Sequence, residues 1–202
     1  IGRNTGWFRD GIVDNLLKKL TYGFWWKQPE TIGASDWIQT AHLAFPEHAV
    51  PQLQEKVILQ IPDHLSNPAF TSLGADYSDT LSEATKLDAL IILPHESVRS
   101  AKIGQRLLQE GNKYDRCGIK RHPRSESELP GDAVHMKEVS ARVPFELLLS
   151  GLKPECCVIG DVSSALLTAR WLRPRLQVIC LAEQSNSLTD LMRKIGIEVS
   201  IV

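Results

Sequence analysis

The sequence lacks an excess of charge of either sign. Its 202 residues contain 23 Lys and Arg against 24 Asp and Glu, which gives a formal net charge of −1. This balance argues against a protein that binds nucleic acid through bulk positive charge. No apolar run reaches membrane-spanning length, and no signal-peptide pattern, internal repeat or low-complexity stretch is found. With 43% hydrophobic residues, the chain is expected to be globular, with a substantial core.

Cysteine is also scarce, and its four copies lack the spacing of metal ligands. They fall mostly within apolar, strand-like runs, at Cys117, Cys156, Cys157 and Cys180. Cysteines in such runs behave as small buried hydrophobic residues. We therefore expect free thiols in a cytoplasmic protein, rather than disulfides or a zinc site.

The second part of the chain alternates apolar runs with helical patterns. Strands are expected at 87–93, 116–120, 134–139, 156–159, 177–181 and 198–202. Helices are expected between them at 102–110, 144–149, 163–171 and 188–195, with Gly111 as the C-cap of the first. Strands that alternate with helices indicate a parallel, doubly wound sheet. The sequence thus predicts an α/β, Rossmann-type domain over residues 86–202.

The first part of the chain is divided by prolines into short pieces. A helical pattern covers residues 10–20, and short strands are expected at 37–45 and 56–61. Residues 71–86 are small and polar, which indicates a linker or a connecting helix. We interpret residues 1–85 as a partial N-terminal domain followed by this linker.

Four aromatic residues gather in this first part, at Phe24, Trp25, Trp26 and Trp37. Flat apolar rings stack on sugar rings, so the cluster is a candidate platform for a carbohydrate. Packing between a helix and a sheet is the alternative, and it is the more frequent role of such residues.

Basic residues and a histidine follow the second strand predicted for the Rossmann-type domain. Pro123 keeps His122 extended, so the imidazole is expected to project from the end of the strand. A histidine in that place is suited to protonate a phosphate leaving group or to donate a hydrogen bond to it. The alternative is a surface histidine in a basic turn. Three neighbouring basic residues fit a single anionic ligand: Lys120, Arg121 and Arg124.

A second phosphate-binding pattern follows the strand at 156–159. There Gly160 is expected to turn the chain into a helix that begins near Ser163 and Ser164. Free N–H groups and the positive end of the helix dipole, together with two hydroxyls, suit a phosphate. Capping of the helix by a hydroxyl uses the same N–H groups and is the alternative.

Two further positions are expected at the same edge of the sheet. Glu146, behind Pro144 and Phe145, is placed to accept hydrogen bonds from ribose hydroxyls. A favourable charge in the first turn of its helix is the other interpretation. His95 and Glu96 follow the strand at 87–93 and are candidates to line the same crevice.

The order of these motifs resembles the nucleotide-binding half of bacterial sialyltransferases, above all the polysialyltransferase and lipooligosaccharide sialyltransferase group. The resemblance covers roughly residues 87–202. It implies a two-domain glycosyltransferase of GT-B type that uses CMP-sialic acid without a metal or cofactor. By resemblance, His122-Pro123 matches the family's His-Pro motif and Ser163-Ser164 its paired-serine motif, both of which hold the CMP phosphate. Glu146 matches the position that contacts the ribose.

One motif of that family is missing, the acidic Asp/Glu-Asp/Glu-Gly triplet that supplies the general base. Arg9-Asp10-Gly11 is the nearest match, but Arg9 replaces an acid and no apolar strand precedes it. Residues 1–7 resemble the glycine-bearing loop that follows the triplet in the family. We therefore expect the base upstream of Ile1, with Asp10 as the alternative.

The resemblance implies inverting transfer of sialic acid to an oligosaccharide or glycolipid acceptor, as in capsule or lipooligosaccharide biosynthesis. A cytoplasmic location is expected, and peripheral association with the inner membrane is compatible with lipid-linked acceptors. Two other classes remain open. One is a different nucleotide-sugar enzyme of the same architecture, such as a UDP-sugar transferase or epimerase. The other is a non-catalytic nucleotide-binding module, which fold alone does not distinguish.

Overall fold

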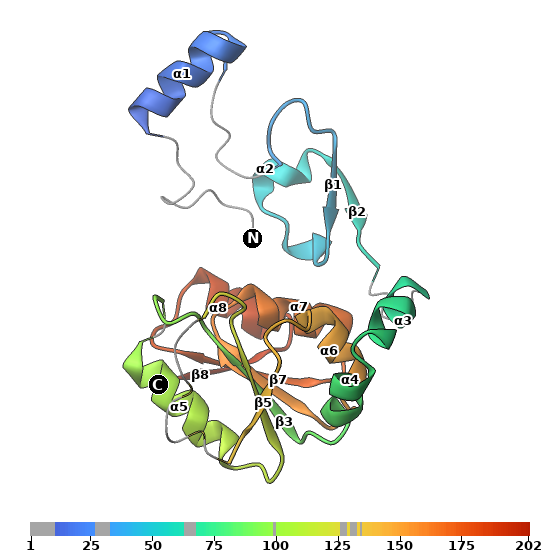
Figure 1. Cartoon of the computed structure of the whole chain (residues 1–202). Coiled ribbons are helices and arrows are strands. Elements are labelled where there is room, and N and C mark those ends of the chain that lie inside the picture. Colours follow the sequence, from blue (N-terminus) through green and yellow to red (C-terminus); the bar gives the residue numbers. More distant parts are fainter. Residues whose placement is uncertain are drawn as a thin grey trace. The chain divides into compact units, whose positions relative to one another are not determined.

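The structure, a computed structural model, describes residues 11–26, 33–62, 68–98, 100–125, 129, 133 and 135–202 (Figure 1). The chain forms two compact units, residues 1–62 and 63–202. The sequence placed the boundary later, at residues 85 and 86. The difference arises because the segment interpreted as a linker forms two helices of the second unit, α3 (Pro68–Ala75) and α4 (Ser78–Ala84).

The first unit contains a small parallel sheet and a helix with an exposed apolar face. Strands β1 (Thr40–Leu43) and β2 (Val57–Gln60) pair in parallel, which confirms the two short strands predicted there. Helix α1 (Ile12–Tyr22) confirms the predicted helix, and none of its residues is buried. The remaining elements are short: η2 (Pro46–His48) and α2 (Pro51–Gln54).

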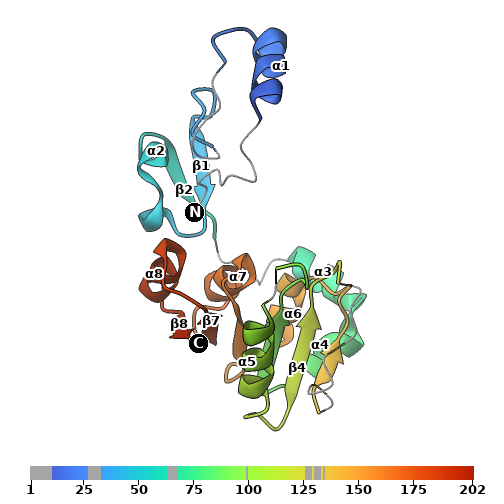
Figure 2. The same ribbon diagram turned by 90° about the vertical axis from the view of Figure 1, so that its left-hand side faces the viewer.

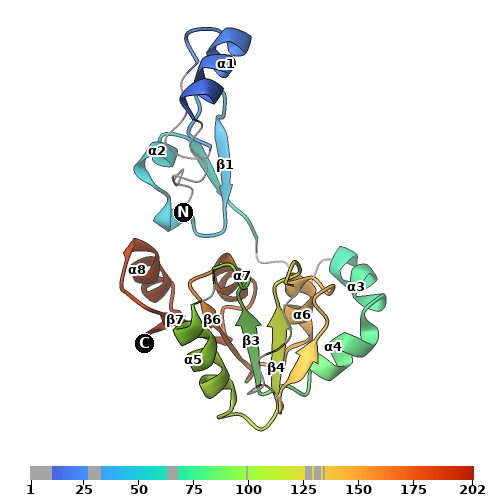
Figure 3. The same ribbon diagram turned by 60° about the vertical axis from the view of Figure 1, so that its left-hand side comes forward.

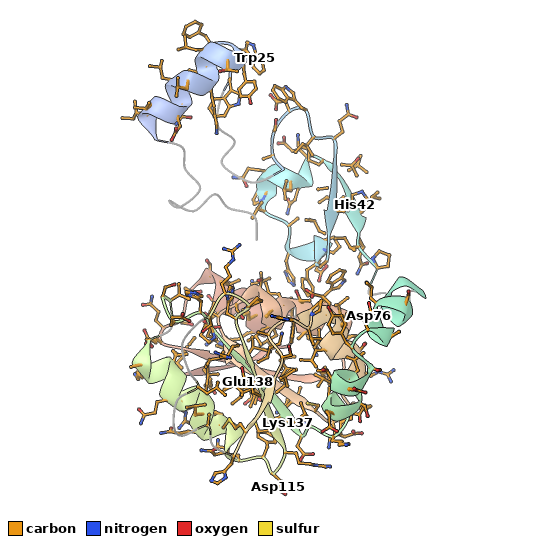
Figure 4. All side chains as sticks on the ribbon, in the orientation of Figure 1. Trp25, His42, Asp76, Asp115, Lys137 and Glu138 are labelled. Atoms are coloured by element: carbon orange, nitrogen blue, oxygen red, sulfur yellow. The ribbon has the colours of Figure 1, made fainter. Side chains whose placement is uncertain are left out.

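The aromatic rings of this unit lie near its surface. Trp25 and Trp37 are 61% and 67% exposed, and their ring centroids lie 5.3 Å apart at an interplanar angle of 61°. Figure 4 shows Trp25 just beyond the end of α1. Neither ring is therefore packed between a helix and a sheet of its own unit, contrary to the more frequent role considered for them.

The second unit is an α/β structure built on one six-stranded, all-parallel sheet. The strand order is β5-β4-β3-β6-β7-β8. The bounds are β3 (Ala89–Leu93), β4 (Cys117–Arg121), β5 (Lys137–Val139), β6 (Cys157–Asp161), β7 (Gln177–Ala182) and β8 (Glu198–Ile201). Counted within this unit the order reads 3-2-1-4-5-6, the order of Rossmann folds. The prediction of a parallel, doubly wound sheet is thus confirmed.

Helices cover both faces of this sheet, and the strand residues alternate between the two cores. Leu90 and Val158 join the core under α6 (Phe145–Gly151), α7 (Ser164–Leu172) and α8 (Ser187–Lys194). Ile91 and Ile159 join the opposite core under α5 (Ala101–Gly111). Figures 1 and 2 show α5 on one side of the sheet, and α6 and α7 on the other. Strands buried on both faces explain the continuous apolar runs of the sequence.

The four cysteines belong to these cores or lie beside them. All four are buried and free, as the sequence predicts. Burial raises the pKa of the Cys117, Cys156 and Cys180 thiols to about 12 and that of Cys157 to about 11. The thiols are therefore neutral at physiological pH and behave as small apolar groups.

Gly111 has a different role from the predicted C-cap. It is the last residue of α5, and Asn112 forms the C-cap in a right-handed conformation. A Cβ atom at Gly111 would lie 2.4 Å from Ile91 Cδ1 and 2.7 Å from Met136 Cε. The glycine thus allows α5 to pack closely on β3, and no positive φ angle is involved.

Gly111→Ala is therefore expected to destabilise the protein by about 1–2 kcal/mol. Overpacking a core costs about 1–3 kcal/mol, and the better helix propensity of alanine returns up to ~1 kcal/mol. Urea denaturation measures the change. Lys102→Ala, at an exposed position of the same helix, is the control and should change stability by less than ~0.5 kcal/mol. Equal stabilities for the two variants would contradict the packing role.

Candidate functional site

A cavity of about 850 Å³ opens at the carboxyl ends of strands β3, β4 and β6. Figure 3 shows β3 and β4 running side by side in the same direction. The cavity is lined by the loops that follow these strands and by the first residues of α6 and α7. The strand order reverses between β3 and β6. Open α/β sheets bind ligands outside the carboxyl ends of the strands at such a reversal, and the volume suits a small molecule.

Five of the predicted site residues meet in this cavity. They come from three different segments of the chain: His122 and Pro123 after β4, Glu146 in the first turn of α6, and Ser163 and Ser164 at the start of α7. The parallel sheet accounts for this convergence, since it brings all strand carboxyl ends to one edge.

Gly160 is the exception among the predicted binding residues. The strand continues through it to Asp161, so Gly160 is buried inside β6 and does not line the cavity. A Cβ atom there would lie 3.1 Å from Leu166 Cδ2. Gly160 therefore supports the site indirectly, because it lets α7 pack closely against β6.

The orientation of the His122 ring follows from its contact with the next turn. The backbone N–H of Arg124 donates to His122 Nδ1 at 3.2 Å. With Nδ1 accepting this hydrogen bond, Nε2 is the ring nitrogen left to act as a donor. The side chain is exposed. His122 therefore has Nε2 available to donate a hydrogen bond to a ligand.

The His95 ring packs against His122 from the neighbouring strand end. The two ring centroids lie 5.3 Å apart and the planes are at 88°. His95 lines the cavity as the sequence suggested, and its Nδ1 accepts the Ser97 N–H at 3.1 Å. Ser125 Oγ donates to Glu96 Oε2 at 2.5 Å, which ties the two loops together. Glu96 thus serves the loops rather than the cavity wall.

Lys120 is a structural residue in this protein. Its side chain is 5% exposed, and Nζ donates to the backbone carbonyl oxygens of Ser140, Ala141 and Val143 at 3.2, 3.3 and 2.7 Å. Burial lowers the pKa of the ammonium, and the carboxylate of Glu146 partly offsets this. The buried ammonium fastens the loop that leads into α6 and so positions Glu146.

Lys120 and Arg121, two of the three basic residues expected to bind one anion, both line the cavity, but their charged groups have partners within the protein. Besides Lys120, Arg121 forms an ion pair with Glu138 of β5, with Nη2 and Oε1 2.6 Å apart. Arg124 lies in an exposed turn and is not part of the cavity wall. These partners follow from the pairing of β5 beside β4, which the order of residues along the chain does not reveal.

The start of α7 contains two buried polar atoms without a hydrogen-bond partner, Ser163 Oγ and Asp161 Oδ1. Ser163 is the N-cap of α7, but its side chain makes no capping hydrogen bond. The capping interpretation thus does not hold for Ser163. Asp161 was not singled out from the sequence, although the first polar residue after a buried strand is a usual place for a binding residue.

The described residues show neither a metal-binding cluster nor a helix suited to a membrane. No group of three or more His, Cys, Asp or Glu side chains is arranged there to hold a metal ion. In the same part of the chain, none of the helices combines the length and hydropathy needed to cross a membrane.

Comparison with known proteins gave no relative: no protein-family model matches the chain, and neither does any curated protein. The class of protein rests on the fold and the cavity. The second unit is an α/β protein with a Rossmann-like parallel sheet and a cavity of ligand size at the reversal of strand order.

Proposed function

We propose that this chain belongs to an inverting, metal-independent glycosyltransferase of GT-B architecture, which transfers sialic acid from CMP-sialic acid to a glycan hydroxyl. One observation supports this above all others. His122-Pro123, Glu146 and Ser163-Ser164 lie far apart in the sequence but line a single cavity. These are the motifs on which the resemblance to bacterial sialyltransferases rests, and all of them occupy the edge where such sheets bind nucleotides.

In this proposal the CMP phosphate lies between His122 and the N-terminus of α7. His122 donates from Nε2, since Nδ1 already accepts the Arg124 N–H. The hydroxyls of Ser163 and Ser164 and the first N–H groups of the helix donate from the other side. As the glycosidic bond breaks, negative charge grows on the phosphate, and fixed donors stabilise that charge more in the transition state than in the substrate.

The other parts of the reaction have their own candidates. Glu146 is exposed in the first turn of α6, where its carboxylate accepts hydrogen bonds from the ribose hydroxyls. A carboxylate of the N-terminal part deprotonates the acceptor hydroxyl, so that attack inverts the configuration. Asp10 and the loop at residues 1–7 lie outside the described residues.

Calorimetric titration with CMP, UMP and UDP tests this proposal. We expect a preference for CMP, and a loss of affinity of about 10- to 100-fold in Ser163→Ala/Ser164→Ala, since hydrogen bonds to a charged group stabilise by ~1.5–3 kcal/mol each. Thr168→Ala, in the same helix but outside the cavity wall, is the matched control and should bind as wild type. A preference for UDP would mean that the sugar donor is a UDP-sugar and not CMP-sialic acid. Absence of binding by all three nucleotides would contradict the proposal.

A further inference from the structure

The unpartnered atoms at the start of α7 require an explanation beyond the phosphate contacts already described. Asp161 Oδ1 and Ser163 Oγ are both buried, and both residues line the cavity. Leaving a buried polar atom without a partner is costly, and native structures do so rarely. Since both residues line a cavity of ligand size, the missing partner is expected to come from a ligand bound there.

The chemistry of the two groups limits what this ligand atom is. A serine hydroxyl both donates and accepts, whereas an ionised carboxylate only accepts. A phosphate oxygen is an acceptor too, so an ionised Asp161 beside it would repel it. A protonated carboxyl is a donor and removes the conflict.

Among the described residues, no lysine or arginine pairs with Asp161 Oδ1 to stabilise the ionised form. The titratable group beside it on β7 is the Cys180 thiol, which is neutral because its pKa is about 12. The cavity wall carries three cationic side chains, Lys120, Arg121 and Arg142. Lys120 directs its ammonium to backbone carbonyl oxygens, Arg121 pairs with Glu138, and Arg142 lies exposed in the loop before α6. The acidic group on the wall besides Asp161 is Glu146.

We propose that Asp161 is a further ligand of the bound phosphate and binds it as the neutral carboxylic acid, alongside the hydroxyl of Ser163. This inference rests on the proposed placement of a phosphate in the cavity. The proton is taken up from solvent when the phosphate binds, and it stays on the carboxyl while the O–H donates to a phosphate oxygen. The phosphate therefore binds together with a proton.

The free protein is already biased towards this state. Burial raises the pKa of Asp161 above its ordinary value of 3.8, while its own backbone N–H and the nearby Ser163 hydroxyl offset part of the rise. In the structure, the Ser163 hydroxyl is near Asp161 but is not placed to form a hydrogen bond with its Oδ1 atom. A bound phosphate adds negative charge beside the carboxyl and raises the pKa further. Between the pKa values of the free and the bound protein, binding must then take up a proton.

Calorimetry of CMP binding in two buffers of equal pH but different ionisation enthalpy measures this uptake. We expect the heat of binding to wild type to depend on the buffer more strongly than the heat of binding to Asp161→Asn. Any proton that CMP itself takes up is common to both proteins, so the difference isolates Asp161. Asparagine keeps a donor, so Asp161→Asn should bind CMP at least as tightly as wild type. Asp161→Ala should lose ~10-fold or more.

Two results would overturn the inference. One is an equal buffer dependence in wild type and Asp161→Asn. The other is a loss of affinity in Asp161→Asn as large as in Asp161→Ala, because the carboxylate would then be an acceptor for a donor group of the ligand. Repeating the titrations with UMP and inorganic phosphate separates this inference from the proposed function. Greater proton uptake by wild type than by Asp161→Asn with all three ligands supports the role of Asp161 even without a preference for CMP, whereas no binding by any of them would overturn both.

Thermal unfolding without ligand checks that Asp161→Asn folds. The sign of the change in melting temperature relative to wild type can also be predicted. An acid whose pKa is raised by folding destabilises the folded state at pH values above that pKa. Asp161→Asn should therefore raise the melting temperature at neutral pH. The gain should fade as the pH falls below 3.8, where the carboxyl is protonated in the folded and unfolded chain alike.

Discussion

Replacement of His122 by alanine is expected to lower kcat of the proposed transfer from CMP-sialic acid by about 100- to 1,000-fold, the usual effect of removing one fixed donor to a developing negative charge. The free energy of unfolding should change little, because the side chain is exposed and truncation leaves no large cavity. Comparing turnover with urea denaturation of the same variant separates the two effects. Turnover equal to that of wild type would remove His122 from the mechanism.

Two further variants of His122 distinguish which ring nitrogen donates a hydrogen bond to the phosphate. The amide nitrogen of glutamine reaches the place of Nε2, whereas that of asparagine reaches the place of Nδ1. Because Nδ1 of His122 accepts the Arg124 N–H, only Nε2 is left to donate to the phosphate. His122→Gln should therefore retain more activity than His122→Asn. The reverse order of activities would mean that the His122 ring flips when CMP-sialic acid binds, so that Nδ1 donates instead of Nε2.

Lys120→Met is expected to have the largest effect on stability, a loss of roughly 3 kcal/mol. Methionine keeps the length and apolar packing of the side chain, but three backbone carbonyl oxygens lose their donor. Hydrogen bonds from a charged donor stabilise by about 1.5–3 kcal/mol each, and relief from burying the ammonium offsets part of the sum. CMP affinity should fall as well, since the released loop leads directly to Glu146.

The matched control for this variant is Lys86→Met. Lys86 is exposed and forms an ion pair with Glu83 at 2.7 Å, and such surface pairs contribute about 0–1 kcal/mol. Urea denaturation of both variants compares the same chemical change at a buried and an exposed site. A loss below ~1 kcal/mol in Lys120→Met would show that the loop holds its place without the lysine.

The fold of the second unit was largely predictable because its strands are buried on both faces. Continuous apolar runs such as the one around Ile159, punctuated by helical patterns, leave few arrangements other than a parallel sheet. Once the sheet is parallel, the polar residues that follow each strand must share one edge. That argument predicts that His122, Glu146 and Ser163 lie at this edge, and all three line the cavity there.

The misassigned residues all depend on neighbours that are distant in the sequence. Gly111, at the end of α5, must be small because Ile91 of β3 packs against it. Lys120 is engaged by a loop some twenty residues later. Arg121 is paired because β5 lies next to β4. Local patterns reveal that a residue is small or charged, but its partners appear only with the strand order. Asp161 is the same case, since being buried without a partner is a property of the folded cavity.

The outer strand β5 has a consequence for how this protein behaves at high concentration. It is the last strand on its side of the sheet, it is three residues long, and it carries Lys137 and Glu138 (Figure 4). A short outer strand with exposed charges is a poor template for strands of another molecule. Titrations at the concentrations that calorimetry needs should accordingly meet little self-association through this edge, and the heats measured there should report ligand binding.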